Sequence, residues 1–411
     1  LFIRQLIRLS NYVVPEDTQK IQFLNGYIVI QGKLGWLTEL QKYIKWYYQN
    51  FMLTRVQLSG RGGLANISET MHKKFCSQLA DYLAEESRAN SVNVVELTKL
   101  SYGAIQENWF VLADFSNGIF EGSQKFCLRM DAPTSIDDSH KRHEEFFLLK
   151  LAFEEGVRVP EPIFFCRDPS ILGREFFITR WIEGNADGRN ITRQKLSASA
   201  RSKLICEIAE QLAAIHKIKP KGKSANFLKD YNSSSAKKVI ADYRAALDDL
   251  PETSAAIEWG LRWAELNIPK NTEKLFCHRD YRVGNLLINK GQLTAVLDWE
   301  FANWSDPMED IAWFCAKCWR FGADTREAGG IGQRSDFYNY YEEKSGRKVD
   351  KNAVFFWEVL AHIRWAIIAR RQGERFASSG ENSLEPAMTA YISPQLEWEI
   401  IGMTGKHKNV Y

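Results

Sequence analysis

The feature that most constrains the fold is a change of sequence pattern near Asn93. From there the chain carries short runs rich in β-branched and aromatic residues, VNVVELTKL, NWFVLADF and KFCLRM, which predict three consecutive antiparallel strands. A helical pattern follows at about 139–155, and two further β-rich runs, VPEPIFFC and REFFITRWIEG, end at Gly184. The pattern therefore predicts a five-stranded antiparallel sheet with one helix.

The segments on either side of this sheet are predicted to be mainly helical. Before it, WLTELQKYIKWYYQNF and MHKKFCSQLADYLAEES place apolar groups at helical spacing, and the glycine-rich LSGRGGLAN between them reads as a linker because it lacks the GK[ST] ending of a phosphate-binding loop. After the sheet, further helical patterns dominate. We expect a helical N-terminal extension over 1–90, a sheet-containing lobe over 91–183 and a mainly helical lobe over 184–411, which is an α+β architecture.

The helical part is interrupted by the segment LFCHRDYRVGNLLINKGQLTAVLDW, in which two β-runs flank the turn NKGQ and predict a hairpin. His278, Asp280 and Asn285 have the spacing HxDxxxxN just before it, and Asp298 follows thirteen residues after Asn285. Phosphoryl transfer needs a carboxylate that orients the acceptor hydroxyl and takes its proton, and oxygen ligands that hold magnesium. Asp280 fits the first role, and Asn285 with Asp298 fits the second.

Each of these residues also has an ordinary structural explanation. His278 alone could be a packed core histidine, Asp280 could cap a turn, and Asn285 could begin a strand. The motif by itself is suggestive only. A carboxylate at the end of the following hairpin, Asp298, favours the catalytic interpretation, because that is where a second metal ligand is needed.

From about Val94 to Ile401 the chain resembles the aminoglycoside phosphotransferase and choline kinase branch of the protein-kinase-like fold. The resemblance is strongest over CHRDYRVGNLLINKGQLTAVLDWEFANWSDPMEDIAW. It implies a bilobal fold with a five-stranded N-lobe and a helical C-lobe, in which Asp280 is the catalytic base within the motif that His278 begins. It also implies that Asn285 and Asp298 are the metal ligands.

The resemblance includes two departures and one further motif. Arg279 stands where this branch usually has glycine, and Arg129 of FCLRMD stands at the family's nucleotide-gripping basic position on the third strand. The alternative for Arg129 is an exposed strand charge. SDPMEDIAW resembles the family's GDP segment with Ser305 in place of glycine, and Asp306 and Asp310 there are expected to tie the loop to the next helix.

The turn SYGAIQENW lies between the first two predicted strands, where a kinase-like lobe covers the phosphates. It has one glycine and no full GxGxxG. The resemblance implies that backbone N–H groups of Gly103, Ala104, Ile105 and Gln106 contact the phosphates.

The remaining nucleotide contacts are expected from the helix after the third strand and from the fifth strand. A helix carboxylate should pair with Arg129, and alignment by the following LLKLAFEEGVRVPEP favours Glu145 over Glu144. Backbone groups from Thr179 to Trp181, in the segment that resembles the family's hinge, should meet adenine.

The sequence constrains the identity of the phosphoryl acceptor least. Six tryptophans of the helical lobe are mostly core candidates, although some could form an aromatic cage for a choline-like cation: Trp299, Trp304, Trp313, Trp319, Trp357 and Trp365. The later helices lack the dense acidic clusters that would suit an aminoglycoside and carry Arg364, Arg370 and Arg371 instead. Relatives associated with acyl-CoA dehydrogenases imply a hydroxyacyl-CoA acceptor.

The predicted function is therefore an ATP- and magnesium-dependent O-phosphotransferase acting on a small-molecule hydroxyl. The alternatives are a non-catalytic nucleotide-binding protein of the same fold and a choline- or aminoglycoside-type kinase; a protein kinase is disfavoured because no DFG or APE segment is present. The net charge of +3 gives no sign of nucleic-acid binding.

Several expectations concern the setting of the protein. No apolar run is long enough to predict a membrane partner, and seven scattered cysteines favour reduced thiols and a cytoplasmic location. The pair Cys315 and Cys318 is predicted to be buried helix sequence and not a zinc site. The role of 1–90 stays open among a helical interaction module, an element that forms a homodimer, and translated upstream sequence.

Overall fold

The computed structural model describes 21–24, 27–30, 64–100, 106–131, 139–222, 225–228, 234–270, 273–378 and 384–405. The chain divides into two units, Leu1–Met71 and His72–Tyr411. The first unit contains an antiparallel hairpin of β1 (Ile21–Leu24) and β2 (Tyr27–Ile30). The mainly helical expectation for 1–90 did not include this hairpin. The expected helix at 36–51 lies outside the described residues.

The second unit contains the five-stranded sheet that the sequence predicts. All neighbouring strands are antiparallel, in the order β3-β4-β5-β7-β6. Their bounds are β3 (Ser91–Lys99), β4 (Gln106–Ser116), β5 (Gly122–Asp131), β6 (Pro162–Cys166) and β7 (Phe176–Arg180). The alternation of side chains along β7 places Phe176 and Ile178 in one core cluster and Phe177 in another, so both faces of the sheet are covered.

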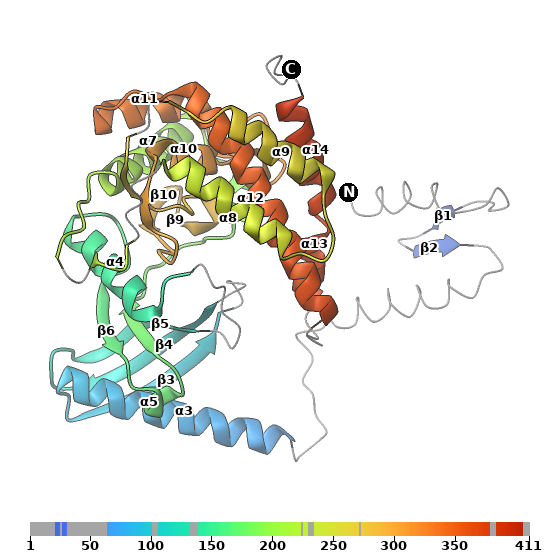
Figure 1. Ribbon diagram of the computed structural model, residues 1–411. Coiled ribbons are helices and arrows are strands. Elements are labelled where there is room, and N and C mark those ends of the chain that lie inside the picture. Colours follow the sequence, from blue (N-terminus) through green and yellow to red (C-terminus); the bar gives the residue numbers. More distant parts are fainter. Residues whose placement is uncertain are drawn as a thin grey trace. The chain divides into compact units, whose positions relative to one another are not determined.

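A different helix covers each face of this sheet (Figure 1). Helix α3 (Leu64–Ser87) packs Leu79, Tyr82 and Leu83 into the cluster that contains Phe176. Helix α4 (Arg142–Glu154) packs on the other face, where the rings of Phe146 and Phe177 lie 5.6 Å apart. The second half of α3 is therefore part of the sheet's core. Its first three residues come from the segment predicted as a linker.

The second lobe is built mainly from helices around one large core. Its helices in the described part of the chain are α6 (Gly188–Arg193), α7 (Ala198–Ile215), α8 (Ser235–Asp248), α9 (Ala255–Leu266), α10 (Pro307–Cys315), α11 (Arg334–Ser345), α12 (Lys351–Ser378), α13 (Leu384–Ala390) and α14 (Ser393–Thr404). By length and composition α12 could cross a bilayer, but 72% of its apolar stretch is buried within the protein, as in the core helix of a globular domain.

Two small antiparallel strand pairs position the HxDxxxxN motif within this lobe. Strand β8 (Leu275–Cys277) pairs with β11 (Asn303–Ser305), and β9 (Leu286–Asn289) pairs with β10 (Gln292–Val296). The predicted hairpin is confirmed: Lys290 and Gly291 form its two-residue turn with φ of +49° and +76°, the left-handed values that such a turn requires. The segment 278–285 therefore begins at the end of β8 and leads into β9.

Candidate active site

A buried carboxylate of α10, that of Asp310, holds the loop 278–285 in place. Asp310 accepts hydrogen bonds from the backbone N–H groups of His278 at 2.8 Å and Arg279 at 2.7 Å. Its Oδ2 also lies 3.1 Å from Nε2 of the buried His216. Burial alone would raise the pKa of Asp310, but the His216 hydrogen bond and the nearby histidines hold it below its usual value. Asp310 thus ties the loop to α10, as the sequence predicts.

His278 connects this loop to the segment that carries Asp298. Its Nε2 lies 3.0 Å from the carbonyl oxygen of Leu297, and its Nδ1 accepts from the backbone N–H of Asp280 at 3.3 Å. Burial lowers the pKa of His278, which matches a neutral ring with one donating and one accepting nitrogen. Leu297 also donates its N–H to the carbonyl of Asn285 at 2.8 Å. These bonds bring Asp298, the next residue, beside Asn285.

The carboxylate of Asp280 is held by three side-chain donors. Asn285 Nδ2 donates to Oδ2 at 2.6 Å, and Trp313 Nε1 donates to Oδ1 at 2.7 Å. Arg282 Nε donates to the same Oδ1 at 3.3 Å. Asn285 Nδ2 also donates to the Asp280 carbonyl at 2.9 Å, so the amide oxygen of Asn285 is left to face other ligands.

Asp298 faces a row of charged side chains from the sheet lobe. Arg129 of β5 forms an ion pair with Asp298 through Nη1, 2.7 Å from Oδ1, and its Nε donates a hydrogen bond to Glu145 of α4 at 3.2 Å. Its Nη2 lies 3.0 Å from the other oxygen of Glu145, as an ion pair without a hydrogen bond. Arg142 reaches the same Glu145 and, at 3.7 Å, Glu300 beyond Asp298. This ion-pair row joins the two lobes.

The electrostatics of this row favour its charged forms. Burial opposes the charge on Asp298 and on Arg129, but their attraction outweighs it, so that the pKa of Asp298 lies below and that of Arg129 above its ordinary value. Burial and the nearby Arg129 lower the pKa of Arg142 to about 10, which leaves it protonated at neutral pH. Asp298 itself has φ of +61°, an uncommon conformation for a residue with a side chain, of the kind that clusters at functional sites.

Comparison with known families agrees with this geometry. The profile of APH, the phosphotransferase enzyme family, matches residues 96–345, which is more than half of the chain. The chain belongs to this phosphotransferase family. Among its curated relatives is acyl-CoA dehydrogenase family member 11 of Pongo abelii, 29% identical over 317 residues that cover 71% of this chain. The match covers 40% of that relative, so the chain spans less than half of its length.

Solved structures of phosphotransferases share the fold. A Ralstonia eutropha protein provisionally assigned as an aminoglycoside phosphotransferase has a TM-score of 0.62 at 19% identity and covers 81% of this chain and 99% of its own. A thermostable mutant of aminoglycoside phosphotransferase APH(4)-Ia, solved with AMP-PNP and hygromycin B, has a TM-score of 0.54 at 15% identity and covers 80% and 100%. At these identities the likeness confirms the kinase-like fold and carries no residue roles.

Part of the expected nucleotide side lies outside the described residues. Gly103, Ala104 and Ile105 are among the residues not described, and Gln106 begins β4 opposite Asp131. Thr179 lies on β7 opposite Cys127. Trp181, just after β7, donates its N–H to the Lys125 carbonyl at 3.1 Å. The phosphotransferase fold thus puts 179–181 beside the strand that carries Arg129.

Three side chains at the centre of the site were not predicted to be there. Trp313 was treated as a core or pocket residue, and neither Arg142 nor Arg282 was singled out. Trp313 lies three residues after Asp310, one helical turn away on the same face of α10, which was the available signal. For Arg142 the available signal was Glu145, three residues later on the same helix and at ion-pair spacing. For Arg282, on the loop, the sequence offered no comparable signal.

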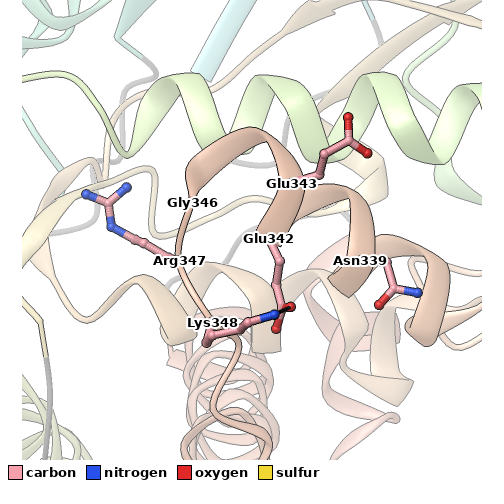
Figure 2. Close-up of a pocket in the computed structure, with 6 residues that line it drawn as sticks. All are labelled: Asn339, Glu342, Glu343, Gly346, Arg347 and Lys348. Carbon is pink, nitrogen blue, oxygen red and sulfur yellow. Dashed lines mark hydrogen bonds and ion pairs between the residues drawn. The ribbon is translucent and has the colours of Figure 1, made fainter.

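A cavity of about 250 Å³ lies elsewhere on this lobe, at the end of α11 (Figure 2). Its walls have mixed charge and consist of Asn339, Glu342, Glu343, Gly346, Arg347 and Lys348. No predicted site residue lines it. The candidate site is therefore defined by the contacts of Asp280 and Asp298 and not by this cavity.

Proposed function

We propose that this phosphotransferase transfers the γ-phosphoryl group of ATP to the hydroxyl of a small molecule, with Asp280 as the base. The observation that carries the proposal is the Asp280 carboxylate, fixed by Asn285, Trp313 and Arg282, next to the segment that brings Asp298 beside Asn285. Asp280 is 8% exposed, so it is shielded but reachable. His278, fully buried, positions the loop and does not touch substrate.

The proposed reaction is one in-line displacement at the γ-phosphorus of ATP. Asp280 accepts a hydrogen bond from the acceptor hydroxyl and takes its proton as the acceptor oxygen bonds to the γ-phosphorus. The bond from that phosphorus to the β,γ-bridging oxygen breaks, and ADP leaves with the electron pair. Asp280 Oδ1 already accepts from Trp313 and Arg282, whereas Oδ2 has one side-chain donor, Asn285, among the described residues and so has room for the hydrogen bond from the acceptor hydroxyl.

The residues around Asp298 fit magnesium. Asn285 offers its amide oxygen and Asp298 its carboxylate, and oxygen ligands are those that magnesium prefers. Two arginines, Arg129 and Arg142, face four carboxylates here, so the row has an excess of negative charge that suits a divalent cation. The four are Asp131, Glu145, Asp298 and Glu300. When bound, the metal would neutralise developing charge on the nucleotide phosphates.

On the nucleotide side, we propose that Arg129 binds phosphate while Glu145 fixes its orientation. Arg129 is 11% exposed and Glu145 3%, so the pair is rigid, and the guanidinium fork can bind phosphate in place of a lysine. The backbone of 103–106 would cover the phosphates, and Thr179 to Trp181 would meet adenine.

For the acceptor we favour a hydroxyacyl-CoA over choline or an aminoglycoside. The faces of Trp319 and Trp313 already carry the guanidinium groups of Arg282 and Arg364, each 4.7 Å from the ring centroid, so a cationic acceptor would meet like charge. Arg364 has no carboxylate partner among the described residues. A relative named for acyl-CoA dehydrogenase activity supports the same class.

The other two arginines named for this role are already neutralised. Arg370 bonds Glu397 at 2.8 Å, and Arg371 lies 3.5 Å from Asp249. The argument for an anionic acceptor therefore rests on Arg364 and Arg282, near the base, and not on the end of α12.

The test is Asp280→Ala in an ADP-release screen over hydroxyacyl-CoAs, choline, ethanolamine, sugars and aminoglycosides. We expect turnover with the best acceptor to fall at least about 100-fold, the range for a general base, while magnesium-dependent ATP affinity stays within about threefold. Normal turnover, or an equal loss of ATP binding, would contradict the assignment. Tight ATP binding without turnover on any acceptor or slow hydrolysis would favour a non-catalytic nucleotide-binding protein.

A further inference from the structure

The three donors to Asp280 differ in how firmly they can hold it. Arg282 is on the same loop, its side chain is 26% exposed, and its bond is the longest of the three at 3.3 Å. Asn285 is also on the loop, and its amide oxygen has the separate role proposed above. Trp313 is 4% exposed, comes from outside the loop, and makes a 2.7 Å bond. It is the donor best suited to fix the carboxylate against the rest of the lobe.

Trp313 is itself packed against two neighbouring side chains. The guanidinium of Arg364 on α12 lies 4.7 Å from its ring, and the ring of Trp319 lies 5.3 Å from it at an angle of 55°. Arg364 also donates to the carbonyl of Arg279 at 2.6 Å, which ties this packing to the loop 278–285. The indole therefore has little freedom to rotate away from Asp280.

One helix thus controls both parts of the loop. Asp310 in the first turn of α10 accepts the backbone N–H groups of 278 and 279, and Trp313, one turn later, donates to the Asp280 carboxylate. The backbone of the loop and the side chain of Asp280 are therefore both anchored to helix α10. Displacements of about 1 Å at a reacting group can cost about 100-fold in rate, so a fixed donor of this kind matters for turnover.

We propose that Trp313 is the positioning residue of this enzyme, orienting Asp280 toward the acceptor hydroxyl through its indole N–H. The inference rests on the proposed function, since it assumes that Asp280 is the base. Trp313 acts through Asp280 and does not contact the substrate. Its loss should lower the rate of the chemical step and leave nucleotide binding unchanged.

Trp365 of α12 provides a control from the edge of the same aromatic cluster. It is half-buried, its ring lies 4.9 Å from that of Trp319, and its Nε1 is buried without an acceptor in the described part of the chain. Replacing Trp365 by Phe therefore removes part of an indole and an N–H that makes no bond, whereas Trp313→Phe also removes the hydrogen bond to Asp280.

The experiment compares Trp313→Phe and Trp365→Phe in the full chain by steady-state kinetics with the best acceptor. A hydrogen bond to a charged group is worth about 1.5–3 kcal/mol, so we expect kcat of Trp313→Phe to fall about 10- to 100-fold with KM for ATP within twofold. Trp365→Phe should stay within about twofold of the parent. Equal losses in both variants, or an unchanged kcat in Trp313→Phe, would overturn the proposal.

A second variant decides the matter if Trp313→Phe does not fold. Incorporation of β-(3-benzothienyl)alanine at 313 keeps the bicyclic shape and replaces the N–H by sulfur, so only the donor is lost. A reduced kcat there supports the positioning role, and parental kcat overturns it. The Asp280→Ala variant separates the two hypotheses. If Asp280→Ala keeps its turnover, Asp280 is not the base. If Asp280→Ala loses turnover but the variant with benzothienylalanine at 313 keeps parental kcat, only the role of Trp313 is contradicted.

Discussion

The two halves of the candidate site are built from different interactions. On the base side, Asp280 is held within the helical lobe, by short bonds from two neutral donors, Asn285 and Trp313, and a longer one from Arg282. On the proposed nucleotide side, Arg129 forms ion pairs with Glu145 of its own sheet lobe and with Asp298 of the helical lobe. One half is fixed inside a single lobe, and the other joins two lobes by charge.

This difference suits the two tasks. A general base must be held in one orientation. Hydrogen bonds from neutral donors and packed aromatic rings do this without placing further charges beside the carboxylate. A site for phosphates and a cation needs charges that a ligand can compete for, and buried ion pairs are held only while each partner is present. We therefore expect substitutions on the base side to change kcat, and those on the nucleotide side to change stability and the KM for ATP together.

The largest effect is expected from Glu145→Gln, which removes the carboxylate between two arginines. Glu145 is 3% exposed and contacts both Arg129 and Arg142, and breaking a buried pair typically costs about 3–5 kcal/mol. We expect a lower melting temperature and a KM for ATP raised at least tenfold. Glu144→Gln is the matched control, because Glu144 is 19% exposed and, in the described part of the chain, contacts the helix start and His140 and neither arginine. Equal effects in both variants would erase the distinction between the halves.

The next effect concerns the core of the sheet lobe and tests whether α3 belongs to it. Leu83 is fully buried against the sheet, and Leu to Ala changes in cores cost about 2–5 kcal/mol. Leu83→Ala should therefore lower the free energy of unfolding by about 3 kcal/mol in denaturant melts, and truncation at Ser91 should do more. Met71→Ala on the same helix, at 68% exposed, is the control. An unchanged truncated protein would make α3 a dispensable extension.

The sequence predicts those parts of the molecule that depend on local pattern. Alternating β-runs predict the five strands, the turn NKGQ predicts the β9–β10 hairpin, and HxDxxxxN predicts the loop at 278–285. These signals lie within a few residues of one another, so spacing alone carries them. The proposed base, Asp280, and its hydrogen-bond partner Asn285 both come from this spacing.

Long-range contacts could not be predicted in the same way. The bond between Trp313 and Asp280 joins residues on different elements, and the row from Arg142 to Glu300 depends on how two lobes meet. The β1–β2 hairpin was missed because its short strands lie in a segment whose neighbouring pattern is helical. Tertiary context, and not the local sequence, decides such cases.

The smallest effect is expected from Arg279→Gly, which restores the residue usual in this branch. Arg279 has φ of +61°, a conformation that costs a residue with a side chain about 1–2 kcal/mol and glycine almost nothing. In this protein, however, its Nε lies 3.2 Å from Glu309, whose side chain is 6% exposed, so glycine would leave a buried carboxylate without its cation.

The relief of backbone strain and the loss of the pair therefore oppose each other. We expect Arg279→Gly to lose about 1 kcal/mol net in denaturant melts, and Arg279→Gly with Glu309→Gln to return to the parental value or above it. Both variants keep the backbone N–H that Asp310 accepts, so kcat should change little. A single variant more stable than the parent would mean that backbone strain outweighs the ion pair. In that case the contribution of Arg279 would lie in binding the acceptor near Asp280 and not in stability.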